Sequence, residues 1–160
     1  YAIHRNTDVT NWNSPVSDIF KHDYWGRDIS DPASHKSYRP LVTLLFKLNH
    51  FFHGLRPIGY HATNIVFHVL NTGLVTMVSK RIFAHIEAPG IDVEGASFMA
   101  ALMFAVHPIH TEAVSSVVGR AEVMCCMFFL LFRGLSPRSF CVYERCGVQS
   151  SRSLPWLEGY

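Results

Sequence analysis

The stretch GYHATNIVFHVLNTGLVTMVS, residues 59–79, decides the fold because it carries no formal charge over 21 positions. About 20 predominantly apolar residues are enough for one helix to cross the hydrocarbon core of a bilayer. We therefore predict a membrane-spanning helix here. The rest of the chain is best interpreted outward from this segment.

Four strongly polar side chains interrupt the stretch: His61, Asn64, His68 and Asn71. Their spacing of 3, 4 and 3 places all four on one face of a helix. Lipid does not satisfy such groups, so this face is expected to point into the protein or into a wet cavity. Two readings stay open, namely hydrogen bonds that join helices and the lining of a transport path.

Basic residues after the span set its direction. Lys80 and Arg81 follow it directly, and cationic flanks mark the cytoplasmic side. Two more apolar runs follow, at 95–106 and 121–132, and the second is followed by Arg133. We expect the last helix to start near Thr111 and to continue to Arg133. The prediction is an all-α, polytopic membrane fold with about three spans over residues 57–133.

The segment before the span has a different pattern. Residues 40–54, PLVTLLFKLNHFFHG, have apolar side chains at helical spacing with Thr43, Lys47 and His50 on the other side. Over residues 40–56 this pattern predicts an amphipathic helix in the membrane interface, and a core helix of a soluble domain is the alternative. Residues 1–39 are expected to form an ordered loop outside the cytosol.

Composition supports a membrane protein. Of the 160 residues, 49% are hydrophobic and only 16% are charged, whereas soluble domains average about 25% charged residues. A net charge of +2 without a basic cluster excludes a nucleic-acid partner. The first residues lack the pattern of a signal peptide and an initiating Met, so we expect the natural beginning to be missing.

The connection HPIHTEAVSSVVGR, residues 107–120, is predicted to be a second loop on the non-cytosolic side. It holds His107, His110, Glu112 and Arg120. The spacing is not that of a zinc protease and Pro108 disturbs a helical presentation, so we predict no metal site. Arg120 suits phosphate binding because its planar fork matches phosphate oxygens. A structural ion pair of Arg120 with Glu112 or Glu122 is the alternative reading.

Two motifs in the first loop are further candidates. KHDYWG, residues 21–26, places Asp23 beside Tyr24 and Trp25, a position typical of a base or a sugar contact; an aromatic membrane belt is the alternative. SHKSYRP, residues 34–40, brings Lys36 and Arg39 to the bilayer surface, where they are candidates for a lipid phosphate or are ordinary snorkelling cations.

The motifs HDYWG, SHKSYRPL, GYHATNIVFHVLN and above all FAVHPIHTEAVSSVVGRAE resemble the transmembrane and tetratricopeptide-repeat (TMTC) proteins over about residues 1–132. The resemblance implies a multi-pass GT-C type glycosyltransferase fold in the endoplasmic reticulum membrane. It also implies transfer of mannose from a dolichyl-phosphate-mannose donor to Ser or Thr of secretory-pathway proteins such as cadherins. No further cofactor is expected.

This resemblance suggests roles for the candidate residues. Asp23 and Glu112 are the catalytic candidates, since an acceptor hydroxyl needs an acid or base. Cations are needed for the leaving phosphate, and we assign donor and phosphate contact to a larger group: Lys36, Arg39, His107, His110 and Arg120.

The sequence also departs from the family pattern. In the family, the first loop carries an acidic pair in a segment that would lie just before Tyr1, so this pair is absent from the sequence. No 34-residue repeat is visible either. After Phe132 the apolar pattern stops, so residues 134–160 are expected to be a divergent, disordered tail. We therefore predict an N-terminal fragment that is inactive by itself. A transporter or channel fragment and a non-catalytic membrane scaffold remain as alternatives.

Overall fold

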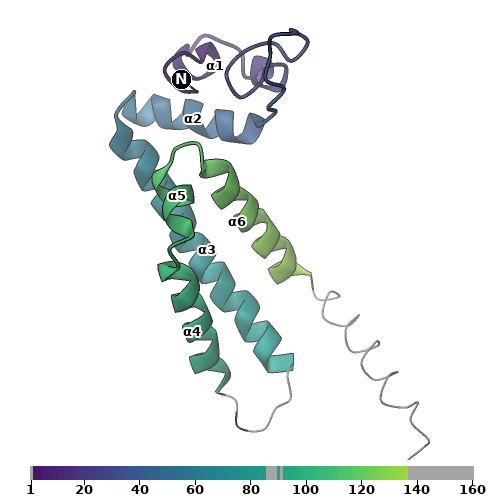
Figure 1. Ribbon diagram of the computed structural model, residues 1–160, viewed down its shortest axis with the longest axis vertical. Helices are drawn as coiled ribbons and strands as arrows, with labels where there is room; N and C mark the ends of the chain where they lie inside the picture. The colour runs from purple at the N-terminus through teal and green to yellow at the C-terminus, as the bar shows by residue number, and fades with distance from the viewer. Residues whose placement is uncertain (1, 86–89, 91, 137–160) are drawn as a thin grey trace, which may run out of the picture. The chain divides into compact units, whose positions relative to one another are not determined.

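A computed structural model describes residues 2–85, 90 and 92–136 of the chain (Figure 1). Within these ranges the secondary structure is helical, and an isolated antiparallel bridge joins His22 to Asp28. The elements in chain order are α1 (Thr7–Thr10), the 3-10 helix η1 (Val16–Phe20), α2 (Pro40–His53), α3 (Pro57–His85), α4 (Val93–Val106), α5 (His110–Ser115) and α6 (Arg120–Leu135). The all-α prediction is thereby confirmed. The expected tail, residues 134–160, lies outside the described residues from 137 onward.

The chain divides into two compact units. The first comprises residues 1–68 and 108–125, and the second comprises 69–107 and the residues from 126 onward. The helices α3 and α6 each contribute residues to both units. Each unit is described by itself below.

Helix α2 is the centre of the first unit. Pro40 occupies its first turn, where a missing N–H removes no helical hydrogen bond. Its buried residues include the polar Thr43 and Lys47, and the Lys47 ammonium donates to the carbonyl and hydroxyl of Ser14 at 2.7 and 2.9 Å. The polar side of this helix is therefore covered by the first loop.

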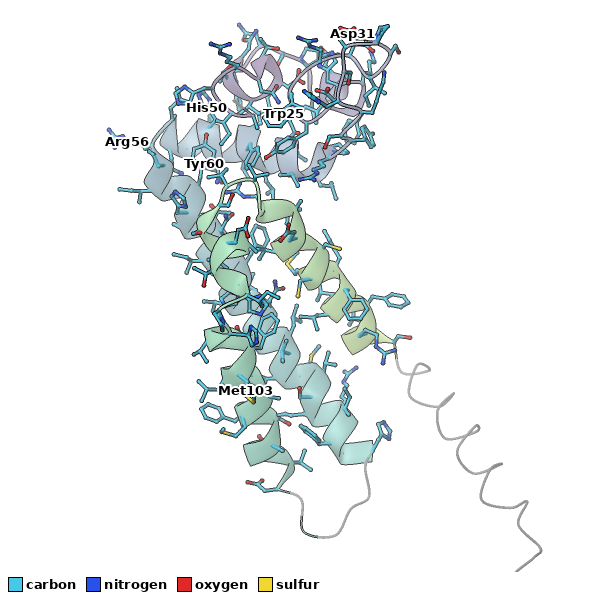
Figure 2. The ribbon with its side chains drawn as sticks, viewed as in Figure 1. Trp25, Asp31, His50, Arg56, Tyr60 and Met103 are labelled. Carbon is cyan, nitrogen blue, oxygen red and sulfur yellow. The ribbon has the colours of Figure 1, made fainter. Side chains whose placement is uncertain are left out.

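The apolar side of α2 remains uncovered among the described residues. Its exposed large side chains are Leu41, Leu44, Leu48, Phe51, Phe52 and, just beyond the helix, Leu55. Trp12 from the loop stacks on Phe51 with ring centroids 4.6 Å apart and is itself exposed. The exposed residues therefore make one side of α2 apolar. Figure 2 shows the first loop, with Trp25 and Asp31, beside this helix.

Aromatic rings form the core of the first unit. Tyr24 from the loop, Phe46 from α2 and Tyr60 from α3 are buried, and Met124 from α6 packs in the same cluster. The ring centroid of Phe46 lies 6.0 Å from that of Tyr24 and 6.2 Å from that of Tyr60. The cluster therefore ties the first loop to the beginnings of two apolar helices.

In the second unit, α3 and α4 are joined at one end by the ion pair of Lys80 with Glu94, at 2.5 Å. Ser97 is fully buried, and its hydroxyl donates to the carbonyl of Val93 one turn earlier. Small residues at 95–97 of α4 permit this close packing.

One of the expected spans meets the length requirement. Among the described residues, α3, with 29 residues, is the helix long and apolar enough to cross a membrane. Helix α4 has 14 residues and α6 has 16, and each is shorter than the roughly 20 residues that a span needs. The prediction of about three spans is thus supported for the first of them.

The predicted continuous helix from Thr111 to Arg133 is wrong. Helix α5 ends at Ser115, the next residue is extended, and α6 begins only at Arg120. At this break the backbone of Gly119 lies so close to Ala113 that a Cβ on Gly119 would be 2.6 Å from the Ala113 carbonyl oxygen. Consequently Glu112, Ser116 and Arg120 do not share one helical face.

We predict that Gly26→Ala destabilises the first unit more than Gly54→Ala. Both glycines have positive φ, at +84° and +59°, but a Cβ on Gly26 would lie 2.5 Å from the Asn6 amide oxygen, whereas one on Gly54 meets nothing within 4 Å. The left-handed backbone penalises each alanine by roughly 1–2 kcal/mol, and crowding adds roughly 1–3 kcal/mol for Gly26→Ala alone. Thermal unfolding of the purified variants in nanodiscs measures the difference, and equal losses would contradict the described turn.

Candidate functional site

The Arg120 guanidinium lies at the junction of the first unit. The residue is 0% exposed. Its Nε donates to the Asn64 amide oxygen at 2.9 Å, and an Nη donates to the Tyr60 carbonyl at 2.8 Å. Its Cζ lies 4.7 Å from the ring centroid of Phe46 and 5.8 Å from that of Tyr60. Arg120 therefore binds neutral oxygens and aromatic faces, and the alternative of an ion pair with Glu112 or Glu122 is wrong.

Asn64 extends this junction to the second loop. Its amide nitrogen donates to the carbonyls of Val114 and Ser116 at 3.2 and 3.0 Å, while its oxygen accepts from Arg120. Asn49 of α2 adds a further acceptor when the oxygen and nitrogen of its side-chain amide are exchanged, the orientation that its hydrogen-bonding neighbours favour. Its oxygen then lies 3.1 and 3.2 Å from the two Arg120 Nη atoms. One buried cation thus links α2, α3, α6 and the second loop.

The polar stripe on α3 is buried in part, as predicted. Asn64 and Asn71 are almost fully buried, while His61 and His68 are half-buried. For Asn64, the reading of hydrogen bonds that join helices is confirmed by its contacts with the second loop.

Two of the predicted phosphate-binding arginines flank one aromatic pair. Arg39 Cζ lies 5.4 Å from the ring centroid of Tyr24. Tyr24 in turn packs against Phe46, and Arg120 lies over the Phe46 ring. Burial raises the pKa of Tyr24, while the charges of Arg39 and Arg120 oppose this rise. Arg39 is exposed at the start of α2, so it is accessible to a ligand in a way that Arg120 is not.

Lys36 has a different position. Its backbone has φ of +56°, and its ammonium donates to the carbonyls of Ile29 and Asp31. The side chain therefore closes its own loop, although it remains exposed to solvent.

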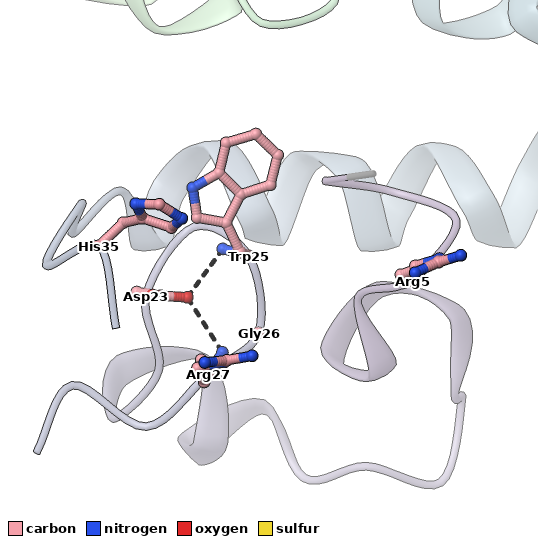
Figure 3. Close-up of a pocket in the computed structure, with 6 residues that line it drawn as sticks. All are labelled: Arg5, Asp23, Trp25, Gly26, Arg27 and His35. Atoms are coloured by element: carbon pink, nitrogen blue, oxygen red, sulfur yellow. Dashed lines mark hydrogen bonds between the residues drawn. The ribbon is translucent and has the colours of Figure 1, made fainter. Parts of the chain in front are cut away.

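Asp23 holds the turn of the KHDYWG motif together. It is 2% exposed, and its carboxylate accepts from the N–H groups of Trp25 and Arg27 at 2.9 and 3.0 Å (Figure 3). It also accepts from the Ser34 hydroxyl at 2.6 Å. Burial raises the pKa of Asp23, but these hydrogen bonds and one from the His35 N–H lower it by more, so the net shift is downward. A carboxylate of low pKa is a weak base. Its catalytic role therefore stays a prediction, whereas its structural role is evident.

A hollow of about 360 Å³ lies beside this turn. It is lined by Arg5, Asp23, Trp25, Gly26, Arg27 and His35 (Figure 3). The lining combines an indole ring with two guanidinium groups, a combination that the sequence motif alone did not reveal.

In the second loop, His110 begins α5, and its ring centroid lies 5.2 Å from that of His68 on α3. Glu112 is exposed in the first turn of α5, and His107 caps the end of α4. Across the described ranges, no group of three or more His, Cys, Asp or Glu side chains has an arrangement that could hold a metal ion. The roles predicted for these three residues stay predictions.

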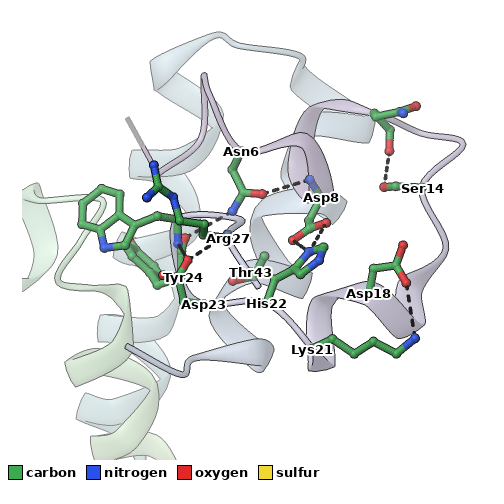
Figure 4. A network of polar contacts seen from close by, with 12 residues as sticks. Asn6, Asp8, Ser14, Asp18, Lys21, His22, Asp23, Tyr24, Arg27 and Thr43 are labelled. Atoms are coloured by element: carbon green, nitrogen blue, oxygen red, sulfur yellow. Dashed lines mark hydrogen bonds and ion pairs between the residues drawn. The ribbon is translucent and has the colours of Figure 1, made fainter. Parts of the chain in front are cut away.

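Sequence reasoning missed one polar pair in the first loop. His22 Nδ1 lies 2.8 Å from a carboxylate oxygen of Asp8, which is buried, and Asn6 caps the same short helix by accepting from the Asp8 N–H (Figure 4). The partners are 14 residues apart, and no periodicity of a regular element connects them. The pair fastens α1 to the KHDYWG turn.

We predict strong coupling between Arg120 and Asn64. In a double-mutant cycle of Arg120→Ala and Asn64→Ala, the interaction energy should reach roughly 1–3 kcal/mol, because each single change leaves a buried partner unsatisfied. Thermal unfolding in nanodiscs measures it, and Glu122→Ala combined with Asn64→Ala is the matched control. Simple additivity of the Arg120 and Asn64 variants would refute the junction.

A pH series tests the role of Asp23. Its folded-state pKa is below the ordinary value of 3.8, so its stabilising effect is complete above pH 3.8 and is lost as pH falls through the lowered value. The difference in unfolding free energy between the wild type and Asp23→Asn should therefore be large at pH 7 and shrink below pH 4. Urea unfolding followed by far-UV circular dichroism measures it. A difference that is constant with pH would show that the charge is not what stabilises the turn.

Comparison with known proteins identifies relatives over nearly the whole chain. It is 42% identical to the mouse (Mus musculus) protein O-mannosyl-transferase TMTC2 over 168 aligned residues, which cover 98% of this chain and 19% of the relative. It is 47% identical to human (Homo sapiens) TMTC1 over 82% of this chain and 14% of the relative, and 41% identical to mouse TMTC4 over 81% and 18%.

The chain therefore spans less than a fifth of the length of these curated relatives. No protein-family model matches it, and no solved structure matches it. The alignment with TMTC2 nevertheless covers 98% of this chain. The chain belongs to the TMTC family of protein O-mannosyl-transferases.

Proposed function

We propose that this chain is a membrane-embedded part of an enzyme that transfers mannose from dolichyl-phosphate-mannose to Ser or Thr hydroxyls of secretory-pathway proteins, cadherin-type proteins among them. Its relatives are named protein O-mannosyl-transferases. The observation that carries the proposal is the Arg120 junction. It holds the second loop against α2 and α3, and the first loop packs on the same aromatic cluster through Tyr24, so both loops with candidate residues belong to one unit. As only part of the enzyme, the fragment is expected to be inactive by itself.

The proposed setting is the membrane of the endoplasmic reticulum. Helix α3 is the candidate span, and the chain is expected to cross the membrane more than once in a GT-C type arrangement. The exposed apolar face of α2, with the Trp12–Phe51 stack at its edge, suits the interface between lipid and water. Both loops then face the lumen, on the side away from Lys80 and Arg81.

The candidate residues divide into two roles under this proposal. Arg39 and His110 contact the donor phosphate, and Glu112 acts on the acceptor hydroxyl because its carboxylate is exposed. Lys36 and His107 keep the phosphate-binding role that the resemblance implies. Arg120 and Asp23 act through other residues, since both are buried and their polar atoms are occupied. They are positioning residues for the junction and for the KHDYWG turn.

A transport path receives less support from the described contacts. Asn64, which belongs to the polar stripe, donates to two carbonyls of the second loop and accepts from Arg120. Its amide is thus engaged in packing and does not line a path.

The proposal is tested in the full-length protein that contains this segment. Purified in nanodiscs with dolichyl-phosphate-mannose, it should transfer mannose to a Ser/Thr-containing cadherin domain, and His110→Ala and Glu112→Gln should each lower kcat by about tenfold or more. His85→Ala, at the far end of α3, is the matched control and should retain full activity. Transfer is measured by mass spectrometry of the acceptor.

Two outcomes would contradict the proposal. Absence of mannose transfer by the folded full-length protein would contradict the proposed activity. Equal transfer by the wild type, His110→Ala and Glu112→Gln would show that these second-loop residues do not belong to the catalytic site.

A further inference from the structure

The Tyr24 hydroxyl is a buried polar group whose hydrogen-bonding capacity the first unit leaves unused. The residue is 2% exposed, and its hydroxyl oxygen has no hydrogen-bond partner within the described part of the chain. The backbone of Tyr24 is held in place, because its carbonyl accepts from the Asn6 amide at 3.2 Å (Figure 4) and its N–H donates to the Ser37 carbonyl at 2.7 Å. A buried hydroxyl without an acceptor destabilises a fold, so this position favours a ligand that accepts from it.

Two positive charges act on this hydroxyl. Burial raises the pKa of Tyr24, and the charges of Arg39 and Arg120 only oppose this rise, so the phenol stays a neutral donor. Neither arginine forms an ion pair with a carboxylate of the described residues. The surroundings of the hydroxyl are therefore positive, and they favour an acceptor that carries negative charge.

Arg39 is the group through which a ligand reaches the hydroxyl. It is exposed, and its Cζ lies 5.4 Å from the Tyr24 ring centroid. Its guanidinium makes no hydrogen bond within the described ranges, so moving it off the ring breaks none. No side chain caps the first turn of α2, which Arg39 precedes, so the positive end of the helix dipole adds to its charge. Phosphate oxygens suit this place because they accept from a guanidinium and from a hydroxyl at the same time.

The leucines that follow Arg39 indicate a phosphate attached to a lipid. Leu41, Leu44 and Leu48, here called the leucine row, are exposed, and their spacing of 3 and 4 places them on one side of α2. A phosphate at Arg39 lies at the beginning of this row, and an attached hydrocarbon chain would cover the leucines. A free phosphate would leave the row uncovered.

We propose that Tyr24 and Arg39 together bind the phosphate of a polyprenyl phosphate, whose chain lies along the leucine row. This rests on the proposed function and deepens it, because it adds the Tyr24 hydroxyl as a ligand of the phosphate and assigns a place to the chain. Arg120 contributes its charge from a distance, since its hydrogen bonds go to Asn64 and Tyr60.

Removal of a single oxygen atom tests this inference. Tyr24→Phe deletes the unsatisfied hydroxyl, whereas the matched control Tyr60→Phe deletes a hydroxyl that donates to the Gly54 carbonyl at 3.0 Å. The full-length protein that contains this segment, in nanodiscs of neutral lipid, is titrated with citronellyl phosphate by isothermal titration calorimetry, and empty nanodiscs correct for partitioning. Tyr24→Phe should raise Kd by about tenfold, because a hydrogen bond to a charged group is lost, and Tyr60→Phe should leave it within about twofold.

Thermal unfolding of the chain in nanodiscs without ligand separates binding from folding. Tyr24→Phe should leave Tm unchanged within about 1 °C, because its hydroxyl has no partner to lose, whereas Tyr60→Phe should lower Tm by about 2 °C or more. Arg39→Gln should raise Kd by about tenfold or more, and Arg56→Gln should leave it within about twofold. Arg56 is the control because it is an exposed arginine beyond the other end of α2.

Two further ligands identify what is bound. Citronellol, which has the same chain without phosphate, and inorganic phosphate should each bind at least about tenfold more weakly than citronellyl phosphate. Equal affinity for either of them would overturn the inference.

An unchanged Kd in Tyr24→Phe, or a loss of Tm as large as in Tyr60→Phe, would overturn it as well, since the hydroxyl would then have no ligand or would have an internal partner. These outcomes differ from failure of the proposed function, because binding is measured without acceptor and without mannose transfer.

Discussion

The buried guanidinium of Arg120 is the constraint on which the first unit depends. A charge removed from water is strongly destabilising unless hydrogen bonds and favourable fields replace its hydration. Here the replacements are the Asn64 amide oxygen, the Tyr60 carbonyl and the faces of two aromatic rings. Since these groups belong to α2 and α3 whereas Arg120 begins α6, the buried charge holds three helices together.

This arrangement explains why polar and apolar residues are mixed along α2 and α3. Asn64 is one of the polar residues that interrupt the apolar pattern of α3, and it serves both Arg120 and the second loop. Phe46 has to lie on the buried face of α2, while Leu44 and Leu48 on the exposed face are left for lipid under the proposed function. The loops that carry the candidate residues are thereby held by contacts with the first turns of α3 and α6.

The sequence predicted the helices well where hydrophobic periodicity and length determine them. Residues 40–54 and 59–79 fall on α2 and α3, and residues 95–106 lie within α4. The sequence failed at residues 111–120, where the helix breaks between Ser115 and Arg120. The break brings Gly119 against the Ala113 backbone, a close approach that no hydrophobic period predicts.

The same limit applies to the site. Arg120 stood out as a cation between two apolar runs, yet its partners are 56 and 60 residues away in sequence, so spacing favoured Glu112 or Glu122 instead. The neighbours of Asp23 suggested a base, but its hydrogen bonds from Ser34 and backbone amides were hidden because they depend on the closed turn. Long-range polar partners require the fold.

The central claim is that α3 crosses the bilayer and leaves both loops in one compartment. Single cysteines placed by Ser17→Cys, Thr111→Cys and His85→Cys, after replacement of the four native cysteines by alanine, are probed in sealed microsomes with a membrane-impermeant maleimide. The account predicts that Cys at 17 and at 111 react only after permeabilisation, while Cys at 85 reacts at once. The account would be contradicted if only one of the cysteines at 17 and 111 reacted before permeabilisation, because the two residues would then lie on opposite sides of the membrane.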